Sequence, residues 1–149
     1  MNKGCIIALV VTFVLVAVAA IVVSTKVFPW MQKLGTAGIV YGTEIAIEGY
    51  TDKYGNPPAG ETHTEIIEAV TGGNEDKRDF FPPDLSQAII DGQVHDGYGN
   101  PLVIQREGKG IIRVFSTGKD GAPDTEDDVT SDAMPEEMKA EFRRKMVSP

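Results

Sequence analysis

Reactive side chains are scarce in this 149-residue sequence, which contains one cysteine and two histidines. Cys5 excludes a disulfide within the chain, and it opens an apolar stretch, whereas a lipid-modified cysteine follows one. His63 and His95 lie beside a predicted helix start and a predicted turn, where we expect surface positions. No serine or cysteine stands in the sequence context of an activated nucleophile, so we expect no catalytic residues and no enzymatic activity.

Basic residues are also in deficit, with 14 lysines and arginines against 22 acids and a net charge of −8. Residues 1–33 contain three lysines and no acid, so the rest of the chain carries −11. A nucleic-acid-binding protein needs a basic patch that displaces counterions from phosphates. The composition therefore argues against a nucleic-acid partner and suits cation binding better.

Against these absences stands one long apolar run at residues 5–23, which contains no charge, proline or glycine. At about 1.5 Å per residue this run covers roughly 28 Å, close to the hydrocarbon thickness of a bilayer. Trp30 follows it, as an interfacial anchor would. We predict a retained signal-anchor with its N-terminus in the cytoplasm. A signal peptide cleaved near Ala17–Ala20 and a helix buried in a soluble core are the alternatives.

The remaining sequence predicts an α+β domain with a small antiparallel sheet. Thr62 and Glu65 have the spacing of a capping box that starts a short helix, and a second short helix is expected from Asp84. Two β-rich runs, 102–104 and 111–115, flank a glycine turn and predict a hairpin. The predicted organisation is a cytoplasmic N-terminus at 1–4, a transmembrane helix at 5–25, a stem helix at 26–53, an α+β domain at 54–133 and a C-terminal helix at 134–149.

The acidic loop, residues 116–132, concentrates six carboxylates after Lys119. Calcium binds carboxylate and backbone oxygens, and the glycines of this loop would let backbone oxygens turn inward. The spacing of the acids is not that of an EF-hand. From the residues alone, a calcium site and a solvated acidic surface both remain open.

Three motifs follow one another in the second half of the chain. They are Asp96-Gly97-Tyr98-Gly99-Asn100-Pro101-Leu102, then, beyond the two predicted strands, Ser116-Thr117-Gly118-Lys119-Asp120-Gly121 and Thr125-Glu126-Asp127-Asp128-Val129. In order and spacing they resemble the C-terminal half of the major pseudopilin of type II secretion systems. The resemblance covers about residues 50–130.

The resemblance implies a pilin-like fold, with a long N-terminal helix and a small sheet packed on its outer half. It also implies calcium in the acidic loop, a structural role in protein secretion, and a place in the bacterial inner membrane with the domain in the periplasm. The implied partners are further copies of the chain, other pseudopilins or the secretion platform. The implied calcium ligands are Thr117, Asp120, Asp127, Asp128 and Val129.

The N-terminus departs from the family pattern. A prepilin has a Gly–Phe or Gly–Met cleavage junction and a glutamate five residues after the glycine, but here Gly4 precedes Cys5 and the glutamate position is Leu9. A membrane-tethered binding module of the cell envelope, outside any secretion filament, is therefore the alternative function.

Overall fold

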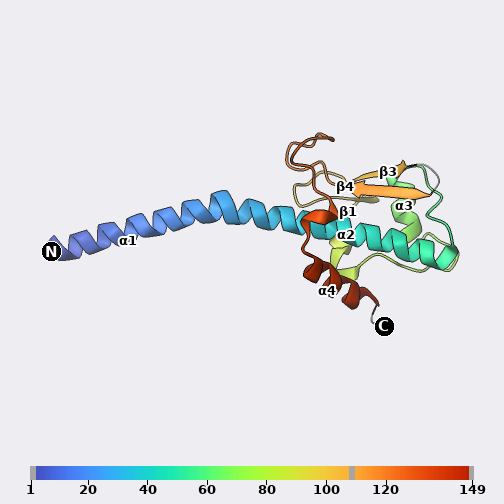
Figure 1. Cartoon of the computed structure of the whole chain (residues 1–149), viewed down its shortest axis with the longest axis horizontal. Helices are drawn as coiled ribbons and strands as arrows, with labels where there is room; N and C mark the ends of the chain where they lie inside the picture. Colours follow the sequence, from blue (N-terminus) through green and yellow to red (C-terminus); the bar gives the residue numbers. More distant parts are fainter. Residues whose placement is uncertain (1–2, 108–109, 148–149) are drawn as a thin grey trace. The chain divides into compact units, whose positions relative to one another are not determined.

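The computed structural model describes residues 3–107 and 110–147, and the chain divides into two compact units, Met1–Gln32 and Lys33–Pro149. The expectation of an α+β protein with a long apolar N-terminal helix is confirmed, although the strands form two small sheets rather than one. Figure 1 shows the helices and strands in chain order.

The first unit is helical throughout its described residues. It contains α1 (Lys3–Val22), a π-helical segment η1 (Val23–Val27) and the start of α2 (Phe28–Tyr54). Pro29 explains the π-helical segment, because proline has no N–H and its ring crowds the carbonyl four residues earlier. The wider turn is visible in the Phe28 N–H, which donates to the Val23 carbonyl.

The apolar part of this helical unit is compatible with a membrane-spanning helix. Within the described residues, the helical stretch Val10–Tyr54 is long and apolar enough to cross a membrane, and an 18-residue window within it has a mean hydropathy of 2.4. None of that window is buried, unlike the core helix of a soluble domain. The exposed side chains include Phe13 and Leu15, with Phe28 and Trp30 beyond them. Such an apolar surface is stable in lipid rather than in water.

In the second unit, α2 supplies the central helix of the fold despite its glycines. Gly42 has a packing role, because a Cβ at this position would collide with Leu85 and crowd Phe142. Tertiary packing of this kind offsets the roughly 1 kcal/mol by which a glycine weakens a helix relative to alanine.

Two apolar clusters pack against α2. Buried side chains of α2, including Val40 and Ile47, join one cluster with α3 (His63–Val70) and the strands, while Ala37 and Tyr41 join another with Val129. Figure 1 shows β3 (Val103–Glu107) and β4 (Ile111–Phe115) on one side of this part of α2 and α4 (Glu136–Val147) on the other. The helix therefore has apolar contacts on two faces, which explains why no single amphipathic stripe is evident in its sequence.

The predicted hairpin is confirmed. β3 (Val103–Glu107) pairs antiparallel with β4 (Ile111–Phe115), and Val103 lies opposite Phe115. Residues 108 and 109 of the predicted glycine turn lie outside the described residues.

The prediction of a second α-helix from Asp84 is wrong in the type of helix and in its extent. Pro83–Ala88 form a 3₁₀ helix, η2, without a side-chain cap, so Gln87 does not complete a capping box. The chain then enters β1 (Ile89–Ile90), which pairs antiparallel with β2 (Gln93–Val94). The turn between them has positive φ at both Asp91 (51°) and Gly92 (77°). Asp-Gly favours this hairpin turn, and a helix could not continue through it.

The capping box of α3 is confirmed. The Thr62 hydroxyl accepts a hydrogen bond from the Glu65 amide at 3.3 Å, and the Glu65 carboxylate accepts one from the Thr62 amide at 3.0 Å. The predicted apolar face of this helix is buried, with Ile66, Ile67 and Val70 at most 1% exposed.

The C-terminal helix α4 contacts α2 through Lys139, Phe142 and Arg143, and the Lys139 ammonium lies 5.8 Å from the centre of the Tyr41 ring. The Phe142 ring lies 5.9 Å from the Tyr41 ring, and Arg143 donates to the Tyr41 hydroxyl and to the Glu48 carboxylate. Most other described side chains of α4 are exposed. A short 3₁₀ helix, η3 (Ser131–Ala133), precedes α4.

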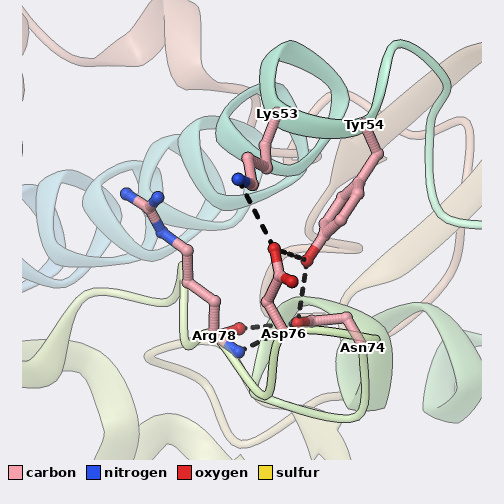
Figure 2. Close-up of polar contacts among 5 residues, drawn as sticks. All are labelled: Lys53, Tyr54, Asn74, Asp76 and Arg78. Carbon is pink, nitrogen blue, oxygen red and sulfur yellow. Dashed lines mark hydrogen bonds and ion pairs between the residues drawn. The ribbon is translucent and has the colours of Figure 1, made fainter.

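The C-terminal end of α2 is linked to residues 71–79 by polar contacts (Figure 2). The Tyr54 hydroxyl donates to Asn74 at 3.0 Å and to Asp76 at 3.2 Å, and Lys53 pairs with Asp76 at 3.5 Å. The Asn74 side chain also bonds to both the amide and the carbonyl of Arg78. These contacts fix the loop that follows α3 onto α2.

Candidate functional site

The first part of the candidate site is a tight turn around Asp96, which is 7% exposed. One carboxylate oxygen, Oδ1, accepts hydrogen bonds from the amides of Tyr98 (2.8 Å) and Asn100 (2.9 Å). The other, Oδ2, accepts from the Ser116 hydroxyl at 2.5 Å. A buried carboxylate needs several donors to replace its lost hydration, and this turn supplies them.

The Asp96 turn is joined to the start of the acidic loop and to α2. The Asn100 side-chain amide donates to the Gly118 carbonyl at 2.8 Å, and the Gly118 amide donates to the Ser116 hydroxyl at 3.0 Å. On the other side, the Gly97 amide donates to the hydroxyl of Thr36, a fully buried residue of α2. The first two of the three sequence motifs, residues 96–102 and 116–121, therefore form one hydrogen-bonded unit.

The acidic loop is closed at its base. Ser116 and Val129 form an antiparallel bridge, in which each amide donates to the other residue's carbonyl at 2.9 Å. Both residues are buried, so the loop starts and ends in the core. This closure brings the third motif next to the second.

Asp127 is the centre of hydrogen bonding within the loop. Its Oδ2 accepts from the amides of Lys119 (2.7 Å) and Asp120 (3.1 Å), and its Oδ1 accepts from the Thr125 hydroxyl at 2.7 Å. The Thr125 hydrogen bond, followed by the backbone amides, lowers the pKa of Asp127 to about 2. The carboxylate is therefore charged at neutral pH.

The other acidic residues of the predicted site differ in their surroundings. The Asp120 carboxylate lies 3.5 Å from the same Thr125 hydroxyl, so the loop brings Asp120 and Asp127 together. Asp128 faces another part of the loop, where its Oδ2 accepts from the Asp124 amide at 2.9 Å. Its Oδ1 is buried and has no hydrogen-bond partner among the described residues.

The residues predicted as calcium ligands thus fit a cation in part. Asp120 and Asp127 converge, and the unpartnered oxygen of Asp128 is the kind of atom a cation would satisfy. Thr117 is buried at the base of the loop, and the Val129 carbonyl already accepts the Ser116 amide. Within residues 3–107 and 110–147, no three acidic, histidine or cysteine side chains are grouped closely enough to hold a metal ion. Backbone carbonyls would have to complete the coordination.

Sequence reasoning missed the link between the Asp96 turn and the loop. Asp96 and Ser116 are 20 residues apart, and Ser116 was expected only as part of a motif. A buried Asp followed at short range by glycines is a known turn former, but its third partner comes from a distant segment that local sequence cannot identify.

The two histidines have more specific surroundings than the expected surface positions. His63 is half-buried, and its Nε2 accepts a hydrogen bond from the Val94 amide at 3.1 Å. His95 is also partly buried, with its Nδ1 3.2 Å from the Gln93 carbonyl.

Comparison with known proteins finds no match to this chain among protein-family models, curated proteins or solved structures.

Proposed function

We propose that this protein is a single-pass, pseudopilin-like structural protein of the bacterial inner membrane, with its domain on the periplasmic side. Its role would be assembly or scaffolding in protein secretion: the apolar helix associates within the membrane and the domain presents a surface to partners. The observation that supports this proposal is the hydrogen-bonded unit of Asp96, Asn100, Ser116 and Gly118, because it joins the motifs on which the family resemblance rests.

The proposal predicts that the full chain stays in membranes and associates there. The chain should resist alkaline extraction from bacterial membranes, and cross-linking in the membrane should give oligomers or adducts with secretion components. Replacing Leu15 and Val18 together by arginine should release the chain, because each charge costs about 2.5–3.5 kcal/mol at the centre of a membrane helix. Replacement of the same two residues by isoleucine is the matched control and should leave the chain in the membrane.

Each alternative gives a different result in the same experiment. Membrane retention without oligomers or secretion partners would favour a tethered binding module of the envelope. Recovery of a shortened, soluble chain would show that the apolar segment is a cleaved signal peptide.

We further propose that calcium stabilises the acidic loop. The residues that would hold it are Asp120, Asp127 and Asp128, with the backbone oxygens of Thr117 and Val129. When bound, the cation would neutralise Asp120 and Asp127, which the closed loop holds near one another. What the chain itself provides is the closure by Ser116 and Val129 and the amide donors that orient Asp127.

Calcium should therefore raise the thermal unfolding midpoint of the full chain in detergent micelles. A ligand that binds only the folded state at about 100 times its dissociation constant adds ~2.7 kcal/mol, enough to shift the midpoint by several degrees. Magnesium and a chelator are the ion controls. Asp120→Asn should abolish the shift, whereas Glu126→Gln, which removes an exposed acid of the same loop, should not. Equal responses to calcium and magnesium in all variants would show that the loop is a solvated acidic surface.

A further inference from the structure

The side chain of His63 joins two elements that are far apart in the sequence. His63 is the first residue of α3. Its ring accepts a hydrogen bond from the amide of Val94, which belongs to β2 and is fully buried. A ring nitrogen accepts an N–H hydrogen bond only when it carries no proton. The contact therefore requires neutral His63.

Among the described residues, the acceptor of this amide is the His63 ring. The neighbouring backbone bonds of β2 use other groups: the Val94 carbonyl accepts from Leu102, and the His95 amide donates to the Ala88 carbonyl. If His63 became protonated, the buried Val94 amide would lose its acceptor and would face a second N–H group. Leaving a buried backbone donor unsatisfied is destabilising.

Burial and the like charge of His95 favour the neutral ring. Burial is the largest cause that lowers the pKa of His63, His95 adds a like charge when protonated, and a hydrogen bond with the Leu102 backbone acts in the opposite direction. The N-terminus of α3 is itself electropositive. The nearby carboxylate of Glu65 is bound to the amides of Glu61 and Thr62. Other charged residues on the elements around the ring are Glu68, Asp91, Asp96, Arg106 and Glu107.

We propose that the hydrogen bond from the Val94 amide to His63 Nε2, here called the His63 latch, is a pH-sensitive contact that holds α3 against β2 at neutral pH and opens when the ring is protonated. This inference does not depend on the proposed function, because it rests on residues outside the acidic loop.

The direction of the pH effect follows from linkage. Because the folded-state pKa lies below the ordinary value for histidine, the unfolded chain binds the proton more readily. The stabilising contribution is complete above a pH of about 6.5 and decreases as the pH falls toward the folded-state pKa. A fall in pH should therefore loosen the contact between α3 and β2.

The test is hydrogen exchange and histidine-ring NMR on the full chain in detergent micelles, between about pH 7.5 and 5. The protection factor of the Val94 amide, corrected for intrinsic exchange, should fall roughly threefold or more over this range as the His63 ring titrates. His63→Gln offers a non-titrating oxygen acceptor, and its Val94 protection should not change with pH. His95→Gln is the matched control: it should retain the response and move its midpoint to higher pH, because the like charge is gone.

Two results would overturn the proposal. One is a His63 ring that titrates at or above about 6.5 without any change in Val94 protection. The other is a His63→Gln variant that keeps the full pH response of the wild type. If His63→Gln fails to fold, the ring titration and the Val94 protection of the wild-type protein still decide the question.

Discussion

Replacement of Asp96 by alanine is expected to lower the free energy of unfolding by about 3 kcal/mol or more. The carboxylate accepts hydrogen bonds from the Ser116 hydroxyl and from the amides of Tyr98 and Asn100, in a largely buried position. Removing it leaves three donors without their acceptor, and each unsatisfied buried donor costs roughly 1–3 kcal/mol. Urea unfolding of the full chain in detergent micelles would measure the loss.

Two further variants distinguish the loss of the hydrogen bonds in the Asp96 turn from the effect of removing a negative charge. Asp132→Ala removes an acid whose side chain is 91% exposed, so it should change stability by less than about 0.5 kcal/mol. Ser116→Ala removes one of the three donors together with the acceptor of the Gly118 amide, and its effect should lie between the other two. An Asp96→Ala variant as stable as Asp132→Ala would refute the structural role of the turn.

The second large effect is expected from Gly118, where alanine should destabilise the protein by about 3 kcal/mol. Gly118 has a φ of 63°, and a Cβ there would collide with the backbone carbonyl of Asp127 and meet its carboxylate at 2.6 Å. Alanine in this conformation costs roughly 1–2 kcal/mol, and forced overpacking costs about 1–3 kcal/mol more. The displaced neighbour is backbone, so it cannot rotate away as a flexible side chain would.

Gly121 provides a matched control within the same loop. Its φ is 70°, but a Cβ would meet nothing closer than the Asn100 side chain at 3.6 Å. Gly121→Ala should therefore show only the conformational cost of about 1–2 kcal/mol. Thermal or urea unfolding of the two variants gives the comparison, and equal losses would contradict the close approach of Gly118 to Asp127.

Local chemistry allowed several elements to be predicted correctly. The capping box at Thr62 and Glu65 and the hairpin of β3 and β4 depend on residues close in sequence, and the structure contains both. The α-helix expected from Asp84 is replaced by η2 and β1, because the Asp91-Gly92 turn, a strong local indication of a hairpin, places Ile89 and Ile90 in a strand.

The rest of the candidate site depends on contacts between distant segments. The bond from Ser116 to Asp96, the bond from Asn100 to Gly118 and the bond from Val94 to His63 span 20, 18 and 31 residues. Residue spacing along one segment cannot reveal such partners. For the same reason, the sequence marked Asp127 as a candidate ligand but could not show that its carboxylate accepts hydrogen bonds from two backbone amides.

The attachment of α4 has a consequence for how the second unit opens. Lys139, Phe142 and Arg143 contact the Tyr41 region of α2, and Phe142 packs against the smaller cluster that contains Tyr41 and Val129. Stability is not uniform within a domain, and an element with few buried contacts opens with a smaller free energy than the global unfolding reaction. We therefore expect α4 to detach and return while the remaining core stays folded, and each detachment would expose the Tyr41 face of α2.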